Sequence, residues 1–274
     1  MKTLFHIAAA AAGILFACAL TENTLILNVR RYKTGFSGMP RTVLLSDLHK
    51  RRFGEDQRRL LRNVAKLKPE YIMIAGDLVS RTETDFTAAG MLLRKLCAIA
   101  PVIISEGNHE VDLPPSLYRE FRQTVAESGA LYLHNSYARL GGINVAGLAL
   151  PASYYRGGKP FGFSGKDVCT AETMQKLLGD CPPDTLLLAH NPLFLPAYAG
   201  WGARLVLSGH VHGGIVRLPV IGGLLSPERR FFPRYDKGCY QMHGTEMIVS
   251  AGLGKLRLFN PPEICLLTAE DAKN

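Results

Sequence analysis

The sequence of this 274-residue chain predicts an α/β fold with a mostly parallel sheet in its earlier part and a second sheet further along. Short apolar runs alternate with amphipathic stretches beyond residue 40, as strands and helices do around such sheets. Hairpin-like strands dominate past about residue 205, where the second sheet is expected. No low-complexity linker or internal repeat interrupts this region, so residues 30–274 are predicted to form one domain.

Seven apolar runs are predicted to be strands, and in most of them the last apolar residue is followed at once by polar residues. They are residues 42–47, 71–77, 102–108, 143–150, 185–191, 204–210 and 246–252. Between the early strands, residues 56–67 place Leu60 and Val64 on one side of a helix and the basic residues elsewhere. Residues 116–128 repeat this amphipathic pattern around Phe121. Strands and helices therefore alternate, as an α/β fold requires.

An apolar segment at residues 4–20 predicts an N-terminal membrane anchor or signal segment over residues 1–29. It carries no charge apart from His6 when protonated, and its length lies between a signal peptide's apolar region and a minimal membrane span. We expect an uncleaved, single-pass anchor in the cell membrane, with secretion after signal cleavage as the alternative. Because the next basic residues are Arg30 and Arg31, the catalytic domain is expected on the extracytoplasmic side.

The charge balance favours anionic partners. The formal net charge is +9 and the isoelectric point is about 9.3, which suits phosphate groups, nucleic acid or an acidic lipid surface. The single tryptophan and the absence of an aromatic and basic pattern that would form a stacking platform for bases argue against specific nucleic-acid binding. Hydrophobic residues make up 47% of the chain, which excludes a disordered protein. No segment indicates an obligate protein partner.

The cysteines do not form a metal-binding or disulfide framework. None is part of a C-x-x-C pair, so neither a zinc ribbon nor a dense set of disulfides is expected. Cys169 and Cys181 either form a local bridge or remain isolated thiols. The six cysteines are Cys18, Cys97, Cys169, Cys181, Cys239 and Cys265.

Metal-ligating side chains follow five of the predicted strands. Asp47 and His49 are two residues apart at the end of the first strand, and side chains at that spacing point to the same side. Loops beyond the carboxyl ends of strands in an open α/β sheet meet in one crevice. Seven ligands are too many for one zinc ion but suit two ions that share a carboxylate. The candidate ligands are Asp47, His49, Asp77, Asn108, His190, His210 and His212.

The motifs D-x-H, G-D, G-N-H-E, H and G-H-x-H occur in this order, and the chain thereby resembles the calcineurin-like metallophosphoesterase superfamily from residue 41 to about residue 268. The strings "SGHVHGG", "LPVIGG" and "SAGLGKLRLFNPPEICLLT" resemble the closing pattern of its membrane-associated bacterial phosphodiesterase branch. The resemblance implies two stacked β-sheets flanked by helices, preceded here by the apolar anchor.

The resemblance also implies a dinuclear metal centre. Mn²⁺ is the expected pair of ions, and Zn²⁺, Fe²⁺ and Mg²⁺ remain open because the ligands mix oxygen and nitrogen. The implied reaction is hydrolysis of phosphodiester or pyrophosphate bonds by a hydroxide between the ions, on substrates that include lipid- or envelope-linked ones. The alternatives are a phosphomonoesterase and a non-catalytic metal-binding scaffold. The implied ligands are Asp47, His49 and His212 for one ion, Asn108, His190 and His210 for the other, and Asp77 as the bridge.

Two further residues are candidate catalytic groups by resemblance. His109 is placed to stabilise the transition state or to protonate the leaving oxygen. Arg81 stands where the protein-phosphatase branch has an arginine that binds phosphate. Ser80 replaces the acidic residue that orients the histidine in those phosphatases, and Thr82 replaces a glycine, so a protein phosphatase is disfavoured.

Two basic segments bear on the substrate and on a membrane-surface partner. Lys50, Arg51 and Arg52 follow the first ligands, where they either attract a second phosphate or form a solvated turn. Residues 225–235 mix aromatic and basic residues, which predicts either a lip that rests on a membrane interface or an ordinary loop with its aromatic rings packed inward.

Overall fold

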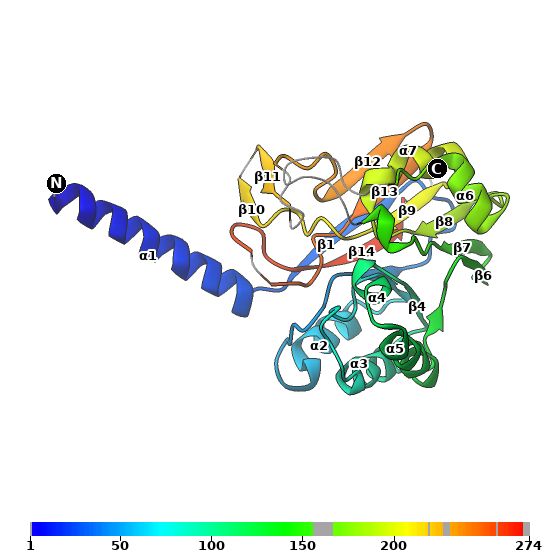
Figure 1. Cartoon of the computed structure of the whole chain (residues 1–274), viewed down its shortest axis with the longest axis horizontal. Helices are drawn as coiled ribbons and strands as arrows, with labels where there is room; N and C mark the ends of the chain where they lie inside the picture. The colour runs from blue at the N-terminus through cyan, green and yellow to red at the C-terminus, as the bar shows by residue number, and fades with distance from the viewer. Residues whose placement is uncertain (1, 156–166, 219, 227–230, 256, 271–274) are drawn as a thin grey trace.

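The computed structural model describes residues 2–155, 167–218, 220–226, 231–255 and 257–270. Two six-stranded sheets are stacked on each other (Figure 1). Helices α2, α3 and α5 lie on the outer face of one sheet, and α6 and α7 lie on the outer face of the other. This arrangement confirms the predicted sandwich of two stacked sheets flanked by helices.

The first sheet has the order β1-β14-β2-β3-β4-β5. The strands β2, β3, β4 and β5 are parallel, and β14 runs antiparallel to β2 and parallel to β1. The first and last strands of the chain therefore lie in one sheet, because β14 comes back to lie between β1 and β2. The bounds are β1 Asn28–Thr34, β2 Thr42–Leu45, β3 Tyr71–Ala75, β4 Val102–Ser105, β5 Leu131–Tyr132 and β14 Glu263–Ala269.

The second sheet has the order β12-β13-β9-β8-β7-β6. Its four central strands are parallel and its two edge strands are antiparallel to their neighbours. The bounds are β6 Ser136–Leu140, β7 Ile143–Gly147, β8 Thr185–Leu188, β9 Leu205–Ser208, β12 Gly238–Met242 and β13 Thr245–Val249. A separate hairpin consists of β10 Val216–Leu218 and β11 Gly222–Leu225.

The helices follow the amphipathic segments. The two helices expected from periodicity are confirmed as α2 Arg58–Lys66 and α5 Pro115–Glu127. The other helices are α3 Thr87–Cys97, α4 Asn108–Val111, α6 Ala171–Leu178 and α7 Leu195–Trp201, with 3₁₀ turns η1 Glu55–Gln57, η2 Ala152–Tyr154 and η3 Pro192–Phe194.

The core has three layers, each formed by the apolar side chains of the strands. Between the two sheets, residues such as Leu44 and Met73 of the first sheet pack against Leu188 and Leu207 of the second. Each sheet also buries its other face under its own helices. Strands that are covered on both faces explain why the predicted runs are almost continuously apolar.

The second sheet begins earlier than the sequence indicated. Its first strand is β6, at Ser136, whereas the hairpin pattern pointed to residue 205. Parallel strands β7, β8 and β9 look like those of the first sheet in sequence, because both sets are buried on both faces. All six cysteines are free thiols, which settles the alternative of a bridge between Cys169 and Cys181.

The N-terminal segment forms helix α1, Lys2–Thr24, which extends away from the two sheets (Figure 1). Arg59 of α2 holds its end, donating hydrogen bonds to the carbonyl oxygens of Thr24 at 2.9 Å and Leu25 at 3.0 Å. Apolar side chains such as Ile14 and Phe16 are exposed. Within the described part of the chain, no helix has the length and apolar character needed to cross a membrane. This finding does not support the predicted single-pass anchor.

Candidate metal centre

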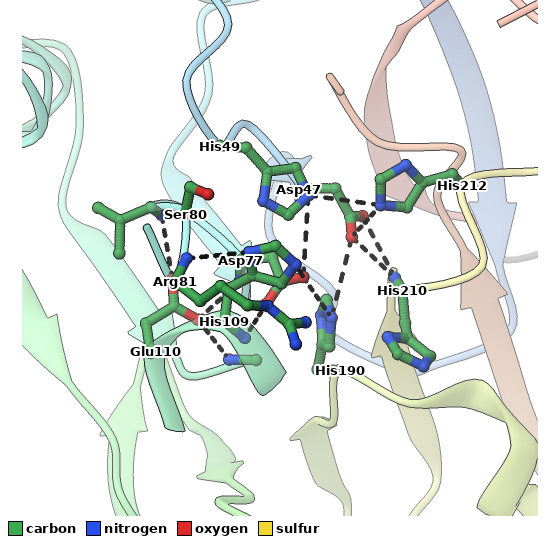
Figure 2. A network of polar contacts seen from close by, with 12 residues as sticks. Asp47, His49, Asp77, Ser80, Arg81, His109, Glu110, His190, His210 and His212 are labelled. Atoms are coloured by element: carbon green, nitrogen blue, oxygen red, sulfur yellow. Dashed lines mark hydrogen bonds and ion pairs between the residues drawn. The ribbon is translucent and has the colours of Figure 1, made fainter. Parts of the chain in front are cut away.

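The polar residues that follow the strands of both sheets meet at one place (Figure 2). Asp47 and His49 follow β2, Asp77 follows β3 and Asn108 follows β4, all in the first sheet. His190 follows β8 of the second sheet, and the two histidines of the G-H-x-H motif follow β9. The structure thus brings together all of the ligand positions predicted from the sequence, because the carboxyl ends of both sets of parallel strands point to the same edge of the sandwich.

The first group of metal-ligating atoms surrounds Asp47. His212 Nε2 lies 3.1 Å from Asp47 Oδ1, and the Nε2 atoms of His49 and His212 are 3.4 Å apart. The backbone N–H of His210 donates to the carboxylate of Asp47 at 3.1 and 3.2 Å and fixes its orientation. Asp47, His49 and His212 therefore converge closely enough for one cation.

The second group surrounds Asp77. His190 Nε2 lies 3.3 Å from Asp77 Oδ2, and the ring of His210 completes a cluster with these two residues. His49 Nε2, from the first group, lies 3.8 Å from the same Asp77 oxygen. Figure 2 shows Asp77 between the two groups, which is the position that a bridging carboxylate needs.

Two buried polar atoms show that this centre suits a cation. Asn108 Oδ1 and His190 Nε2 have no hydrogen-bond partner among the described residues. His190 Nδ1 lies 2.7 Å from the carbonyl oxygen of Ala75 and donates to it, so Nε2 is the ring nitrogen that faces the carboxylate of Asp77. Buried polar atoms are rarely left without a partner, and a divalent cation would satisfy both of these.

The histidines keep the two buried carboxylates ionised. Burial alone would raise the pKa of Asp77, but His190 and its neighbours hold that pKa well below its usual range. Asp47 behaves in the same way because of His212 and His190. Burial alone would lower the pKa of His190, and the Asp77 carboxylate instead raises it to about 10. The centre therefore contains two ionised carboxylates. The histidines balance their negative charge, and a bound cation could balance it instead.

The backbone at the ligands is unusual. Five of the seven predicted ligands have a positive φ: 53° at Asp47, 49° at His49, 53° at Asp77, 70° at His210 and 55° at His212. Asp and His are among the few residue types other than glycine that are enriched in this region, and it still costs about 1–2 kcal/mol per residue. Such outliers cluster at functional sites, where the surrounding structure maintains them.

Glycines let the loops approach the carboxylates. A Cβ atom at position 107 would lie 2.3 Å from Asp77 Oδ1, and a Cβ atom at position 209 would lie 2.5 Å from Asp47 Oδ2. Neither space can hold a methyl group. Gly107 and Gly209 of the motifs G-N-H-E and G-H-x-H are thus required by the close approach of neighbouring loops.

Glu110 is a supporting residue that the sequence reasoning missed. It is completely buried, and its carboxyl group accepts backbone N–H bonds from Gly107 at 2.7 Å, Asp77 at 2.9 Å and Val79 at 3.1 Å. Burial, and then the charge of Asp77, raise the pKa of Glu110 to about 8. Its place at the end of G-N-H-E was the available signal. Glu110 ties the loop after β3 to the loop after β4.

His109 is held in one tautomer by the backbone. The N–H of Arg81 donates to His109 Nδ1 at 3.1 Å, so Nδ1 is the acceptor and Nε2 carries the proton. Nε2 lies 3.9 Å from Asp77 Oδ2, at the edge of the centre. Burial lowers the pKa of His109 to about 4. In the protein phosphatases an acidic residue at the position of Ser80 orients this histidine. Here the backbone N–H of Arg81 orients it instead, and the neutral imidazole of His109 presents its Nε2–H to the site.

Arg81 lies at the mouth of the site with its side chain fixed. Its Nη1 is 2.6 Å from Asp112 Oδ2, and the guanidinium is about two-fifths exposed. Both residues line a cavity of about 520 Å³ in front of the centre, together with Tyr155. Tyr155 packs its ring 5.5 Å from that of His210, and no sequence pattern had marked it.

The basic turn after His49 is mostly occupied by structural contacts. Lys50 Nζ donates to the carbonyl oxygen of Thr82 at 2.9 Å, and the buried Arg51 donates to the carbonyl oxygen of Gly254. Arg52 is exposed. Lys50 and Arg52 are therefore exposed basic groups of the kind that the sequence suggested, whereas Arg51 is buried.

The aromatic segment at residues 225–235 divides in two. Phe231 and Phe232 are exposed, at 59% and 63%, whereas Tyr235 is buried in the core of the second sheet. Arg229 and Arg230 lie outside the described residues. One aromatic ring of this segment therefore packs inward and two face outward, and the lip on a membrane interface stays a prediction.

The comparison with family models establishes which protein family the chain belongs to. The model of the calcineurin-like phosphoesterase domain matches residues 40–214, which contain all of the predicted ligands. The chain belongs to the calcineurin-like phosphoesterase family. The resemblance read from the motifs is thereby confirmed, whereas its membrane-associated branch stays a prediction.

The similarity to known relatives extends over most of the length of this phosphoesterase. The metallophosphoesterase YkuE of Bacillus subtilis (strain 168) is 27% identical over 85% of this chain and 80% of its own. The phosphodiesterase YaeI of Escherichia coli (strain K12) is 25% identical over 82% of this chain and 80% of its own. The solved structure of the phosphopantetheinyl hydrolase PptH of Mycobacterium tuberculosis aligns with a TM-score of 0.48 and 16% identity, covering 80% of this chain and 92% of that one.

The family and the clusters of histidine and aspartate show a metal-dependent phosphoester hydrolase. A divalent metal centre and a phosphate-ester substrate follow from the same findings.

Replacing Gly107 tests whether the close approach of the loops maintains the centre. Gly107→Ala should lower turnover by about 100-fold, because the new methyl group displaces Asp77 and misplacement by about 1 Å has that effect on catalysis. The matched control is Gly35→Ala, where a Cβ atom has no neighbour within 4 Å. Hydrolysis of a chromogenic phosphodiester measures both variants. Equal activities would contradict the role given to this glycine.

Proposed function

We propose that this phosphoesterase hydrolyses phosphodiesters with two divalent cations held at the candidate metal centre. The observation that carries the proposal is the pair of three-residue clusters, one around Asp47 and one that includes Asp77, together with the buried, unpartnered Asn108 Oδ1 and His190 Nε2. The proposed ligands are Asp47, His49 and His212 for one cation, Asn108, His190 and His210 for the other, and Asp77 for both.

When bound, the two cations supply charge that stabilises the phosphoryl oxygens in the transition state and lower the pKa of water at the site. His109 contributes a neutral hydrogen-bond donor, because its Nε2–H faces the centre while its Nδ1 is held by the backbone of Arg81. We assign His109 to a non-bridging phosphoryl oxygen. Of the two roles that the resemblance offered, this geometry supports stabilisation of the transition state over protonation of the leaving group.

The charge around the cavity supports a diester over a monoester. A monoester carries a second negative charge and needs further dedicated cations. Four basic residues line the cavity. Arg81 is paired with Asp112, and Lys50 and the buried Arg51 donate to backbone carbonyl oxygens. This leaves Lys255 to balance the single charge of a diester. The E. coli relative is named a phosphodiesterase, which agrees with this reading. A disubstituted pyrophosphate is an anhydride, but each of its phosphorus atoms carries a single negative charge as in a diester, so it belongs in the same substrate panel.

A second groove beside the centre supports substrates that carry an apolar group. It has a volume of about 520 Å³ and shares the loop of His49 and Lys50 with the catalytic cavity. Leu48, Met91 and Leu92 give it an apolar side, and Arg52 is among its basic residues. We place the leaving group of a lipid- or envelope-linked phosphodiester in this groove. The exposed Phe231 and Phe232 agree with access to such a substrate at a membrane surface, on the extracytoplasmic side proposed from the charge distribution.

The Asp77→Asn variant tests the metal-dependent reaction. Its metal affinity and its turnover should each fall by more than about 100-fold. A loss of that size is the upper limit for a residue that only supports a ligand. Metal content by mass spectrometry and hydrolysis of bis(p-nitrophenyl) phosphate, with Mn²⁺, Zn²⁺, Fe²⁺ or Mg²⁺ added in turn, measure both. Asp184→Asn is the matched control, since Asp184 is an exposed aspartate with a positive φ of 51°. Full metal content and turnover in Asp77→Asn would sink the proposal, and faster cleavage of p-nitrophenyl phosphate would favour a monoesterase.

The His109→Ala variant distinguishes a hydrogen-bond donor from a proton donor. We expect similar losses, of about 10²–10³-fold, with p-nitrophenyl and alkyl leaving groups, because a bond to a non-bridging oxygen matters equally for both. Single-turnover rates on matched aryl and alkyl methyl phosphodiesters measure the two losses. A much larger loss on the alkyl ester would show instead that His109 protonates the leaving group.

A further inference from the structure

Another cavity, separate from the metal centre and from the groove beside it, lies where β1 of the first sheet meets the hairpin of β10 and β11. It has a volume of about 470 Å³, and none of the proposed metal ligands lines it. Arg30 and Tyr32 contribute from β1, Arg217 from β10, and Lys237 from the residue before β12. Figure 1 places this hairpin on the same side of the molecule as α1.

The alternation of β1 determines which of its side chains face the cavity. Asn28, Arg30 and Tyr32 are spaced by two residues and all line it. Arg31 lies between them in the strand, is exposed, and is not part of the lining. The two adjacent arginines of β1 therefore face different surroundings.

Positive charge in the cavity exceeds negative charge. Arg30 Nε lies 3.6 Å and Lys237 Nζ 3.7 Å from the same oxygen of the buried Glu263. Arg217 Nη1 lies 2.5 Å from Asp236 Oδ2. Three cations thus share two carboxylates, and Glu263 also accepts the backbone N–H of Ala251.

Two observations indicate that the excess charge is available to a ligand. Burial lowers the pKa of Lys237, and the charges of Arg217 and Arg30 lower it further, although Glu263 opposes them. The hydroxyl oxygen of Tyr32 is buried and has no hydrogen-bond partner among the described residues. An acceptor with negative charge would relieve the repulsion among the cations and would also satisfy the hydroxyl group.

We propose that this cavity binds a phosphate group through Arg30, Arg217, Lys237 and Tyr32. The rim of the cavity bears the partly exposed ring of Phe259, and Val220 and Ile221 are exposed at the turn of the neighbouring hairpin. These apolar side chains favour a phosphate carried by a lipid headgroup over inorganic phosphate. The two sources share the same recognition chemistry and are separated by the experiment.

The first arm compares Arg30→Glu with Arg31→Glu in the full chain. The two variants have the same change in net charge in the same strand, and any phosphate bound at the metal centre is common to both. Calorimetric titration with inorganic phosphate should show at least about tenfold weaker binding at the second site in Arg30→Glu, because a charge-assisted hydrogen bond is lost. Tyr32→Phe, which changes no charge, should weaken the same binding step, and thermal melts confirm that each variant is folded.

The second arm uses co-sedimentation with vesicles of phosphatidylglycerol and, separately, of phosphatidylcholine. A lipid source predicts that Arg30→Glu binds phosphatidylglycerol vesicles more weakly than Arg31→Glu, with equal binding to phosphatidylcholine. A free-phosphate source predicts a difference in the calorimetric arm alone. The proposal is overturned if the two charge-reversal variants behave alike in both arms, since the cavity would then add nothing to the overall charge.

Discussion

The ion pairs that join the two sheets at the metal centre are the interaction on which the rest of this structure depends. Asp77 follows a strand of the first sheet and His190 follows a strand of the second. His190 Nε2 lies 3.3 Å from Asp77 Oδ2. Asp47 and His212 form the equivalent pair at 3.1 Å. A buried carboxylate without a partner would cost several kcal/mol, so neither sheet can present its aspartates without the histidines of the other. Stacking the sheets with their carboxyl ends at one edge satisfies this constraint, and the apolar layer between them holds the stack.

The same centre stores backbone strain and is supported from behind. The positive φ values of Asp47, Asp77 and three histidines are maintained because the loops are tied to each other. Glu110 accepts three backbone N–H groups from two of these loops, and Gly107 leaves room for the carboxylate of Asp77. The bonds that fix the ligands are thus made largely by the backbone, so the side chains of the ligands remain available to a cation.

The sequence predicted seven of the strands, the order of the ligand-bearing loops and their convergence, because buried parallel strands give apolar runs and their ends are marked by Asp, Asn and His. It missed β14, although that strand lies between β1 and β2. It did not predict features that depend on tertiary packing. The backbone N–H of Arg81 sets the tautomer of His109. The buried Arg51 donates a hydrogen bond to the carbonyl oxygen of Gly254, which is distant in sequence. Neither contact leaves a pattern among neighbouring residues. The apolar composition of residues 4–20 predicted a membrane anchor. The structure has helix α1 there, and within the described residues no helix meets the length and apolar character of a membrane span.

The most direct test of the account is a crystal structure of the Mn²⁺-loaded protein with anomalous scattering at the manganese edge. The account predicts two peaks, one ligated by Asp47, His49 and His212 and the other by Asn108, His190 and His210, both in contact with the carboxylate of Asp77. A single peak, or two peaks of which only one contacts Asp77, would contradict the shared centre on which the proposed reaction rests.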